Sequence, residues 1–369
     1  MKTRKVFLLF LFVTAYLLSL QSYAQVSRKT VKKNNKNMSK FRGQKNTFTK
    51  QKQYMYAGLS VDALNYFGDI VPKSNFASTK ISFTRPGVSG HFGYRIGPRV
   101  TLRASLSYGK LQSDDFVVAD PSGDNSKFRY IRNTQFKNSI VDLSVVGIVD
   151  LKKNSATYLN RAPFTPYALI GFSVFHHNPK GLVPEMDYTK GGGSAPTAFS
   201  NAGEWVALEP LGTEGQYATL EPTDANYGIK PYSLWQISIP FGIGMRYKLS
   251  DAIDFSFDFS VRWLFTDYID DVSSNYVDLD VLDSDLARAM SYRSNEPTSV
   301  ATGEPRDISG WEKREYVGRN GGTYDVITGF GEEYTENKRG GSKYNDIYYV
   351  SSIRIVYILG ASFRTAKFR

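Results

Sequence analysis

Apolar and polar residues alternate with a period of two through the later part of the chain. Between residues 254 and 265 every odd position is apolar, whereas the even positions include Asp, Ser and Arg. The same alternation covers residues 232–249 and the last segment, residues 347–363. Because successive side chains of a β-strand point to opposite faces, each segment predicts a strand with one apolar and one polar face.

Earlier segments complete a predicted set of eight strands; they are residues 54–66, 85–96, 100–110, 136–151 and 167–177. The segment at 167–177 is apolar on both faces, so its facing stays unassigned. A soluble sandwich or a lipocalin-like barrel would also alternate. Strands of about 10 or more residues, with large aromatic side chains on one face, favour a barrel that spans a membrane.

Connection lengths supply a second, independent signal. The joins alternate between longer and shorter segments, in chain order residues 68–78, 97–99, 112–127, 152–163, 180–230, 250–253 and 272–343. Outer-membrane barrels have short periplasmic turns and long external loops. The sequence therefore predicts an all-β fold, an eight-stranded antiparallel transmembrane outer-membrane β-barrel with large extracellular loops at about 180–230 and 272–343.

The first residues have the three zones of a secretory signal. Lys2, Arg4 and Lys5 precede an apolar stretch to about Leu20, and small or polar residues end at Ala24. We therefore expect a signal peptide over residues 1–24, a basic periplasmic arm over 25–53 and the outer-membrane barrel over 54–369. After the signal there is no run of about 20 apolar residues, which a membrane-spanning helix needs. The absence of cysteine excludes a lipid anchor on cysteine and a disulfide framework.

The net charge of +11 arises largely in one segment. Residues 25–52 contain ten Lys or Arg residues and no acidic residue, and they are poor in apolar side chains. This composition predicts a disordered arm. The rest of the chain is not basic, so we expect no nucleic-acid partner. Three roles stay open for the arm: contact with anionic lipid head groups, docking to a periplasmic partner, or a solubilising tail.

Several charged residues fall on the inward face of the predicted strands; they are Asp62, Arg103, Asp142, Arg246, Asp258, Arg262 and Arg354. The lumen of an eight-stranded barrel is just wide enough for side chains. Buried charges must be paired, because each unpaired charge costs several kcal/mol. We therefore predict lumen ion pairs that involve Arg246, Asp258, Asp62, Arg262 and Arg354. If Ser250 faces Asp254 across the tight turn, Arg246 stands opposite Asp258, and the plugged barrel does not conduct solutes freely.

Six strings along the chain resemble one family of outer-membrane barrels. They are NYFGD (65–69), PYALIGFSVF with NPKG (166–181), LEPLGTEGQ (208–216), IPFGIGMRY (239–247), TDYIDDVSSNYVD (266–278) and RGGSKYNDIYY (339–349). Together they are similar to the Bacteroidota outer-membrane barrels related to the PorG component of the type IX secretion system, a family of largely undefined function. The resemblance spans about residues 54–363. It implies an accessory barrel that anchors periplasmic rings of the secretion or gliding machinery to the outer membrane.

The sequence contains two kinds of candidate site, a group of aspartates and three histidines, and each also has a structural interpretation. Asp267, Asp270 and Asp271 are candidate metal ligands, since hard cations take carboxylate oxygens, but the calcium-loop spacing is missing and a structural role at the loop base is favoured. The histidines, His91 and the pair His176 and His177, could act with an aspartate on water or serine. No serine elbow, metalloprotease motif or phosphate loop accompanies them. We expect no enzymatic activity and no cofactor.

Two functions remain. The first is a non-enzymatic outer-membrane barrel that acts as an anchor or accessory platform, which the resemblance places with type IX secretion or gliding machinery. The alternative is a surface-exposed barrel that binds a ligand or partner through its extracellular loops, which are acidic: residues 182–230 hold seven acidic and two basic residues. The expected partners are outer-membrane lipid or lipopolysaccharide and periplasmic ring or other envelope subunits. The expected location is the outer membrane of a Gram-negative cell.

Overall fold

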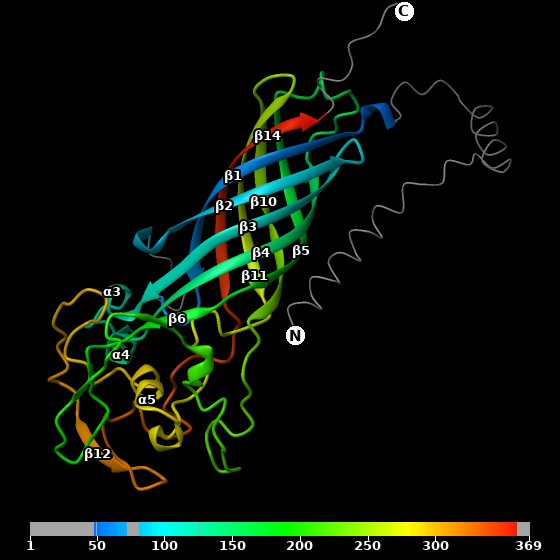
Figure 1. The fold of residues 1–369 in the computed structure, drawn as a ribbon. Helices are drawn as coiled ribbons and strands as arrows, with labels where there is room; N and C mark the ends of the chain where they lie inside the picture. Colours follow the sequence, from blue (N-terminus) through cyan, green and yellow to red (C-terminus); the bar gives the residue numbers. More distant parts are fainter. Residues whose placement is uncertain (1–47, 49, 72–80, 125, 360–369) are drawn as a thin grey trace, which may run out of the picture. The chain divides into compact units, whose positions relative to one another are not determined.

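The computed structural model describes residue 48 and residues 50–71, 81–124 and 126–359. The expected signal peptide and the expected arm up to residue 47 lie outside these residues. Within the described part of the chain, no helix is both long enough and apolar enough to cross a membrane. The dominant element is a closed antiparallel β-barrel of eight strands, which confirms the predicted fold class (Figure 1).

The described barrel wall consists of β1 (Tyr54–Phe67), β2 (Arg85–Arg95), β3 (Val100–Asp114), β4 (Gln135–Asp150), β5 (Phe164–His176), β10 (Trp235–Lys248), β11 (Ile253–Leu264) and β14 (Ile347–Leu359). Each strand pairs with its neighbours in the order β3, β2, β1, β14, β11, β10, β5, β4, and the pairing of β3 with β4 closes the ring. The first strand, blue in Figure 1, therefore lies beside the last, which is red.

Side chains on the outer wall are apolar and exposed on every strand. Examples, one for each strand in chain order, are Leu59, Val88, Leu106, Leu143, Ile170, Ile243, Trp263 and Ile355. The most exposed of these, Leu59, has 73% of its surface accessible. Inward positions carry Ser, Asp, Arg and Tyr side chains that are buried. The barrel thus has an apolar outside and a polar inside.

The facing of β5, which the sequence left open, follows from the packing of its inner side chains. Ile170 and Phe172 point outward and are exposed, whereas Tyr167 and Leu169 point inward. These two inner side chains form an apolar cluster with Val146 and Ile148 of β4. The inner face of β5 is apolar where Tyr167 and Leu169 pack against this cluster, although the hydroxyl group of Tyr167 reaches Asp258 in the charged part of the lumen.

Short connections lie at one end of the barrel. In the β10–β11 turn, the backbone N–H groups of Leu249 and Ser250 donate to Ile253 O at 3.0 and 3.1 Å. Asp254 therefore pairs with Lys248, and the expected pairing of Asp254 with Ser250 is wrong. The register differs from the expected one by two residues, so Arg246 stands opposite Ser256 and Gly244 stands opposite Asp258.

The last residues of the expected arm are structured at this end. Lys50–Lys52 form a short 3-10 helix, η1. The Gln53 side chain donates to Ile96 O at 3.2 Å and accepts a hydrogen bond from Tyr94 at 2.7 Å. These contacts attach the start of β1 to the end of β2.

A folded cap covers the opposite end (Figure 1). We use the word cap for the described residues within 115–134, 177–234 and 265–346. Its elements are α3 (Asp115–Val118), α4 (Ser126–Arg132), β6 (Pro179–Leu182), β7 (Met186–Asp187), β8 (Thr197–Ala198), β9 (Trp205–Ala207), η3 (Glu209–Leu211), η4 (Leu279–Val281), α5 (Asp285–Ser291), β12 (Lys313–Val317) and β13 (Thr323–Ile327). The short 3-10 helix η2 (Ile81–Phe83) precedes β2.

The cap has an apolar core of its own. Tyr276, Val277, Tyr292, Val326 and Ile327 are fully or almost fully buried and pack together in one cluster. Its helices are short, and a side chain at the N-terminus stabilises the first turn of α3 and of α5. Asp114 accepts from the first backbone N–H groups of α3, and Ser284 does so for α5. The cap is therefore a packed unit rather than a set of independent loops.

Candidate functional site

Carboxylate and guanidinium groups fill the middle of the barrel lumen. Asp258 of β11 accepts two hydrogen bonds from Arg354 of β14, at 2.6 and 3.1 Å, and Arg103 of β3 lies 3.3 Å from the same carboxylate. The Tyr167 hydroxyl of β5 also donates to Asp258. All four side chains are buried. One carboxylate therefore ties four strands together across the lumen.

A second carboxylate, Asp150 of β4, has the same role nearer the short turns. Its two oxygens pair with Arg95 at 2.6 Å and with Arg246 at 3.0 Å. The predicted pair between Arg246 and Asp258 is wrong, because the turn register places Arg246 next to Asp150 instead. Each of the two carboxylates thus faces two arginines. The paired positive charges come from strands far apart in the sequence, which the alternation pattern cannot show.

His91 lies between two serines in the same lumen. Its Nε2 is 2.8 Å from Ser60 Oγ, and its Nδ1 is 2.7 Å from Ser105 Oγ. Ser60 also lies 2.8 Å from Asp62 Oδ1, to which it donates, and Ser89 donates to the other carboxylate oxygen. Asp62, which the sequence placed among the ion pairs, has hydroxyl groups as its hydrogen-bond partners in the described chain.

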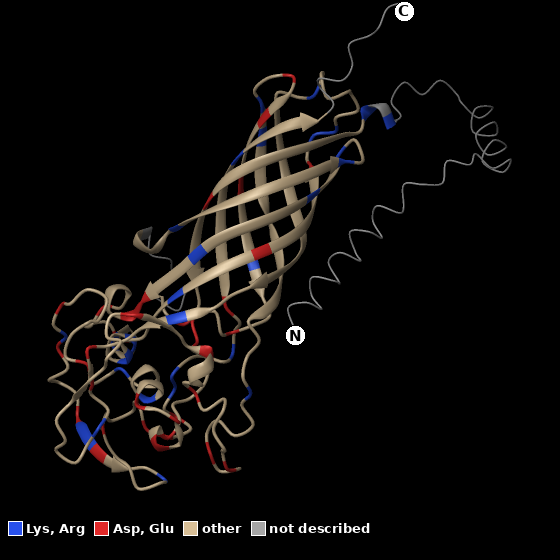
Figure 2. Ribbon diagram, in the orientation of Figure 1, with Lys and Arg blue, Asp and Glu red and all other residues tan. Residues whose placement is uncertain are grey.

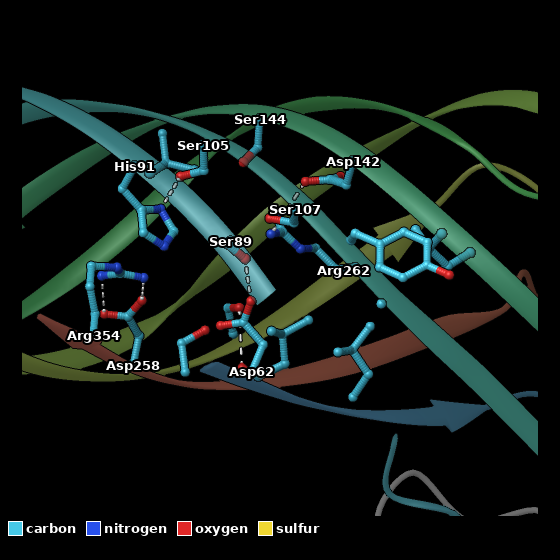
Figure 3. A pocket seen from close by; sticks show the side chains of 18 of the residues that line it. Asp62, Ser89, His91, Ser105, Ser107, Asp142, Ser144, Asp258, Arg262 and Arg354 are labelled. Carbon is cyan, nitrogen blue, oxygen red and sulfur yellow. Dashed lines mark hydrogen bonds and ion pairs between the residues drawn. The ribbon is translucent and has the colours of Figure 1, made fainter. Parts of the chain in front are cut away.

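The remaining predicted lumen charge, Arg262, lies 3.5 Å from Asp142. Figure 3 shows this pair, the His91 group and the pair of Asp258 with Arg354 around one interior space. The cavity there has a volume of about 30 Å³, and a second one toward the turns has about 10 Å³. Cavities of this size have room for water but not for an organic substrate. The arrangement of serine, histidine and aspartate therefore serves as a hydrogen-bonded filling of the lumen.

Two lumen tyrosines lie over glycines of the neighbouring strand. Tyr56 is paired with Gly93, and Tyr167 is paired with Gly244. A Cβ added at either glycine would come within 2.5 Å of the tyrosine ring. Glycine is therefore required at both positions for the rings to lie flat across the lumen, and the rings close much of the remaining space.

A buried ion cluster around Arg339 lies inside the cap, next to the contact between the cap and β1. The guanidinium group lies 3.0 Å from Glu214 Oε1 and 3.4 Å from Asp271 Oδ2, and all three side chains are almost fully buried. Asp271 also accepts hydrogen bonds from Thr213 and Tyr232, each at 2.6 Å. Three of the strings that carry the family resemblance, those beginning at residues 208, 266 and 339, therefore meet at one point.

A second cluster connects β1 to this junction. The Tyr66 hydroxyl lies 2.5 Å from Asp270 Oδ2 and 3.0 Å from Asp346 Oδ1, and it accepts a hydrogen bond from the backbone N–H of Asp69 at 2.9 Å. The other oxygen of Asp346 accepts from the N–H of Ile269 at 3.0 Å. A hydroxyl group has only one proton to donate, so the contact with the second carboxyl group requires that group to be protonated.

The protonation of these carboxyl groups follows from their burial. Burial, with the neighbouring Asp69 carboxylate, raises the pKa of Asp270 well above its usual range. Burial and the Asp270 carboxylate do the same for the pKa of Asp346. The pKa of Asp267 rises to about 9 for the same two reasons, burial first and Asp69 second. The pKa of Asp271 rises only to about 6, because Arg339 opposes the effect of burial.

Arg132 of α4 links the cap to both clusters. Its guanidinium group pairs with Asp115 at 2.7 and 2.8 Å and donates to the backbone oxygens of Asp69 at 2.9 Å and Arg339 at 2.7 Å. Sequence reasoning missed Arg132, Arg339 and Glu214 as organising residues. Arg339 and Glu214 lie within strings of the resemblance, which is the available signal, whereas Arg132 lies between the predicted loop at 112–127 and the predicted strand at 136–151, in a segment without an assignment.

The structure places two of the three candidate metal ligands in different surroundings. Asp271 faces Arg339, whereas Asp270 faces Tyr66. Among the residues that the structure describes, no three acidic or histidine side chains are grouped as metal ligands. His177 is stacked on Tyr232, with the ring centroids 6.1 Å apart, and His91 lies in the lumen cluster. The histidines therefore belong to separate surroundings.

We predict that Asp258→Asn destabilises the folded barrel by about 3–5 kcal/mol, because it leaves the buried charges of Arg103 and Arg354 without a carboxylate. The measurement is the free energy of unfolding in urea. The folded and unfolded fractions are read from the difference in gel mobility between the folded and the unfolded barrel. Asp251→Asn is the control, since Asp251 pairs with Lys248 on the exposed turn. Equal stability of the two variants would show that the lumen network is not needed to hold the strands together.

We predict that the cap opens more readily as the pH rises. A carboxyl group whose pKa is raised by folding contributes stability that is fully present below the unfolded pKa, about 4, and is lost as the pH rises through the folded pKa. For Asp267 the loss extends to a pH of about 9. Proteolysis of the cap, normalised to an unstructured peptide at each pH, should quicken from pH 5 to pH 9, and less so in Asp267→Asn. A rate that is constant or falls with pH would contradict the protonated junction.

A family model described as "Domain of unknown function (DUF6089)" matches residues 42–195, which run from the expected arm through β1–β5 into the cap. The match covers less than half of the chain and is a likeness over that segment. A search of the curated proteins finds no match.

Solved structures of outer-membrane proteins show a distant likeness. Neisserial surface protein A has 9% identity and a TM-score of 0.31, with 82% of this chain and 96% of that chain covered. Ail of Yersinia pestis has 6% identity and a TM-score of 0.32, with 84% and 99% covered. A major outer membrane protein of Thermus thermophilus has 10% identity and a TM-score of 0.32, with 82% and 99% covered. The assignment of the fold rests on the strand pairing described above.

Proposed function

We propose that this chain is a non-enzymatic outer-membrane barrel that holds a folded cap at the membrane surface as a platform for interactions. The observation that carries the proposal is the inverted polarity of the barrel. Its wall exposes large apolar side chains on all eight described strands, whereas the charged side chains of its lumen are buried. A soluble barrel would bury the apolar face, and an apolar surface that encircles a protein calls for an apolar surrounding.

Strand length agrees with a membrane location. The barrel strands range from 11 residues in β2 to 16 in β4. A tilted transmembrane strand needs about 9–11 residues to cross the hydrocarbon. Every described strand is therefore long enough, and closure of the ring leaves no strand edge with unpaired backbone groups in the hydrocarbon.

The filled lumen argues against a role as a channel. Asp258 and Asp150 each hold two arginines across it, and the cavities that remain have volumes of about 30 and 10 Å³. A solute would have to displace paired, buried charges in order to pass. The barrel is thus better suited to holding the cap than to transport.

The orientation of the cap is inferred from connection lengths and the expected signal peptide. Short joins such as residues 249–252 lie at one end, and the cap lies at the other (Figure 1). Outer-membrane barrels keep their short turns in the periplasm. The proposal therefore places the cap outside the cell and the basic arm in the periplasm.

The packed cap supports the surface-binding version of the platform. Its own core and the junction around Arg339 hold it in one arrangement, so it can present a fixed surface to a ligand or partner. Flexible loops would lose conformational entropy when a partner binds, and this loss would lower the affinity. The excess of acidic residues over residues 182–230 favours a cationic ligand or a basic protein surface.

A narrower role as an accessory platform of type IX secretion or gliding machinery rests on the resemblance of the strings alone. Several of these strings supply the residues of the junction, namely Tyr66, Glu214, Asp271 and Arg339. A barrel that carries a similar cap would need similar strings whatever its partner. The resemblance therefore supports a shared architecture more strongly than a shared machine, and recovery of ring subunits that depends on residues 26–53 would favour the narrower role.

We predict that an impermeant maleimide labels Tyr344→Cys in intact cells but labels Asp251→Cys only after the envelope is permeabilised. Both side chains are exposed, at 73% and 68%, one in the cap and the other in the β10–β11 turn. The chain has no native cysteine, so each label reports one site. Labelling of Asp251→Cys but not of Tyr344→Cys in intact cells would reverse the orientation, and equal labelling of both in a soluble fraction would refute the membrane location.

A further inference from the structure

A row of basic side chains crosses the outer face of the barrel wall at the end nearest the cap. Its members, which we call the basic row, are Lys110 on β3, Lys137 on β4 and Lys180 on β6. Figure 2 shows blue segments on the strands of this wall close to the cap. The three lysines are half-buried, so their stems lie along the wall while their amino groups can reach solvent.

Strand register brings these side chains together. Lys137 is directly opposite Lys180 on one side and Gln112 on the other. Lys110 lies two residues from Gln112 on the same face of β3, which places it diagonally across from Lys137. Directly opposed residues of antiparallel strands lie on the same face, with Cβ atoms about 4.5–5.5 Å apart. Two lysines in that position repel each other, and an anion between them would remove the repulsion.

The described part of the chain does not supply that anion. Across the described residues, none of the three lysines lies within ion-pair distance of a carboxylate, although seventeen such pairs form elsewhere. The aromatic partner of the row is Trp205, whose ring lies 5.2 Å from Lys137 Nζ. Paired charges are the rule for the arginines of the lumen. An unneutralised row on the wall beside them therefore points to an external anion.

The height of the row on the wall identifies the kind of anion. Tyr108 and Val141 are directly paired and are the last strongly exposed apolar residues of β3 and β4 before the cap. Lys110 follows Tyr108 by two residues and Lys137 precedes Val141 by four, which are about 7 and 13 Å along the tilted strands. The head-group layer extends about 5–8 Å beyond the hydrocarbon on each side. Flexible lysine side chains at these positions reach that layer.

We propose that the basic row binds the phosphate groups of an anionic glycolipid of the outer leaflet, the lipid A part of lipopolysaccharide. The inference rests on the proposed function, in which the cap side of the barrel faces outward. Phosphates lie at the level of the row, and the exposed apolar wall below it, including Leu106 and Leu143, lies where the acyl chains would be. The row and the wall together match a ligand with a charged head and an apolar body.

The test compares three proteins by native mass spectrometry of the folded barrel in detergent with added lipid A. They are the wild type, the triple variant Lys110→Gln, Lys137→Gln, Lys180→Gln, and a control of equal charge, Lys230→Gln, Lys313→Gln, Lys343→Gln. The control lysines are exposed side chains of the cap, outside the eight strands of the wall. Each lysine near an anionic head group contributes on the order of a fivefold change in affinity. The triple variant should therefore bind lipid A on the order of a hundredfold more weakly, while the control stays near the wild type.

Three results would overturn the proposal: unchanged binding by the triple variant, equal loss in the control, or equal wild-type affinity for dephosphorylated lipid A. Equal binding of phosphatidylglycerol would show that the basic row binds anionic lipids in general. That result would also contradict the proposal. The gel mobility of each variant shows that the barrel is folded. A folded wild type that fails to enter phospholipid vesicles would refute the proposed membrane location itself, whereas insertion without lipid A selectivity would refute only the basic row.

Discussion

Pairing of β3 with β4 closes the sheet, and the rest of the molecule depends on this closure. It leaves no strand edge in the described barrel, so the backbone is satisfied by strand pairing alone, and side chains must divide between an outer wall and a narrow lumen. Charges on the inner face are cut off from bulk water and need partners within the lumen. Asp258 and Asp150 meet that need by facing two arginines each, which joins strands across the interior.

The same constraint continues into the cap junction. Arg339 there is almost fully buried and is balanced by Glu214 and Asp271, one from each of two long connections. Beside it, Tyr66 contacts Asp270 and Asp346, and burial raises the pKa of both carboxyl groups well above the usual range. Guanidinium pairs and protonated carboxyl groups are two ways of avoiding an unbalanced charge in a low-dielectric interior. The barrel and the cap are therefore joined by polar contacts that exclude water.

Local patterns in the sequence predict the barrel well, because strand facing depends on nearest neighbours along the chain. Alternation in residues 254–265 predicts β11, and the turn at 97–99 marks the β2–β3 connection. Pairing across the lumen depends on register, which turn geometry sets. A shift of two residues at Ser250 was enough to give Arg246 a different partner. The junction was beyond prediction because Glu214 and Arg339 are separated by 125 residues, and nothing local marks them as partners.

A single-cysteine scan along β4 tests the central claim, that the wall of this barrel faces lipid and its interior is filled. Spin labels at residues 141–149 in reconstituted bilayers would be probed with oxygen, which concentrates in lipid, and with a water-soluble nickel complex. Val141, Leu143 and Val145 point outward, whereas Asp142, Ser144 and Val146 point inward. We predict high oxygen and low nickel accessibility at the outward positions, with little accessibility to either reagent at the inward ones. Outward positions open to the nickel complex, or a scan without a period of two, would contradict it.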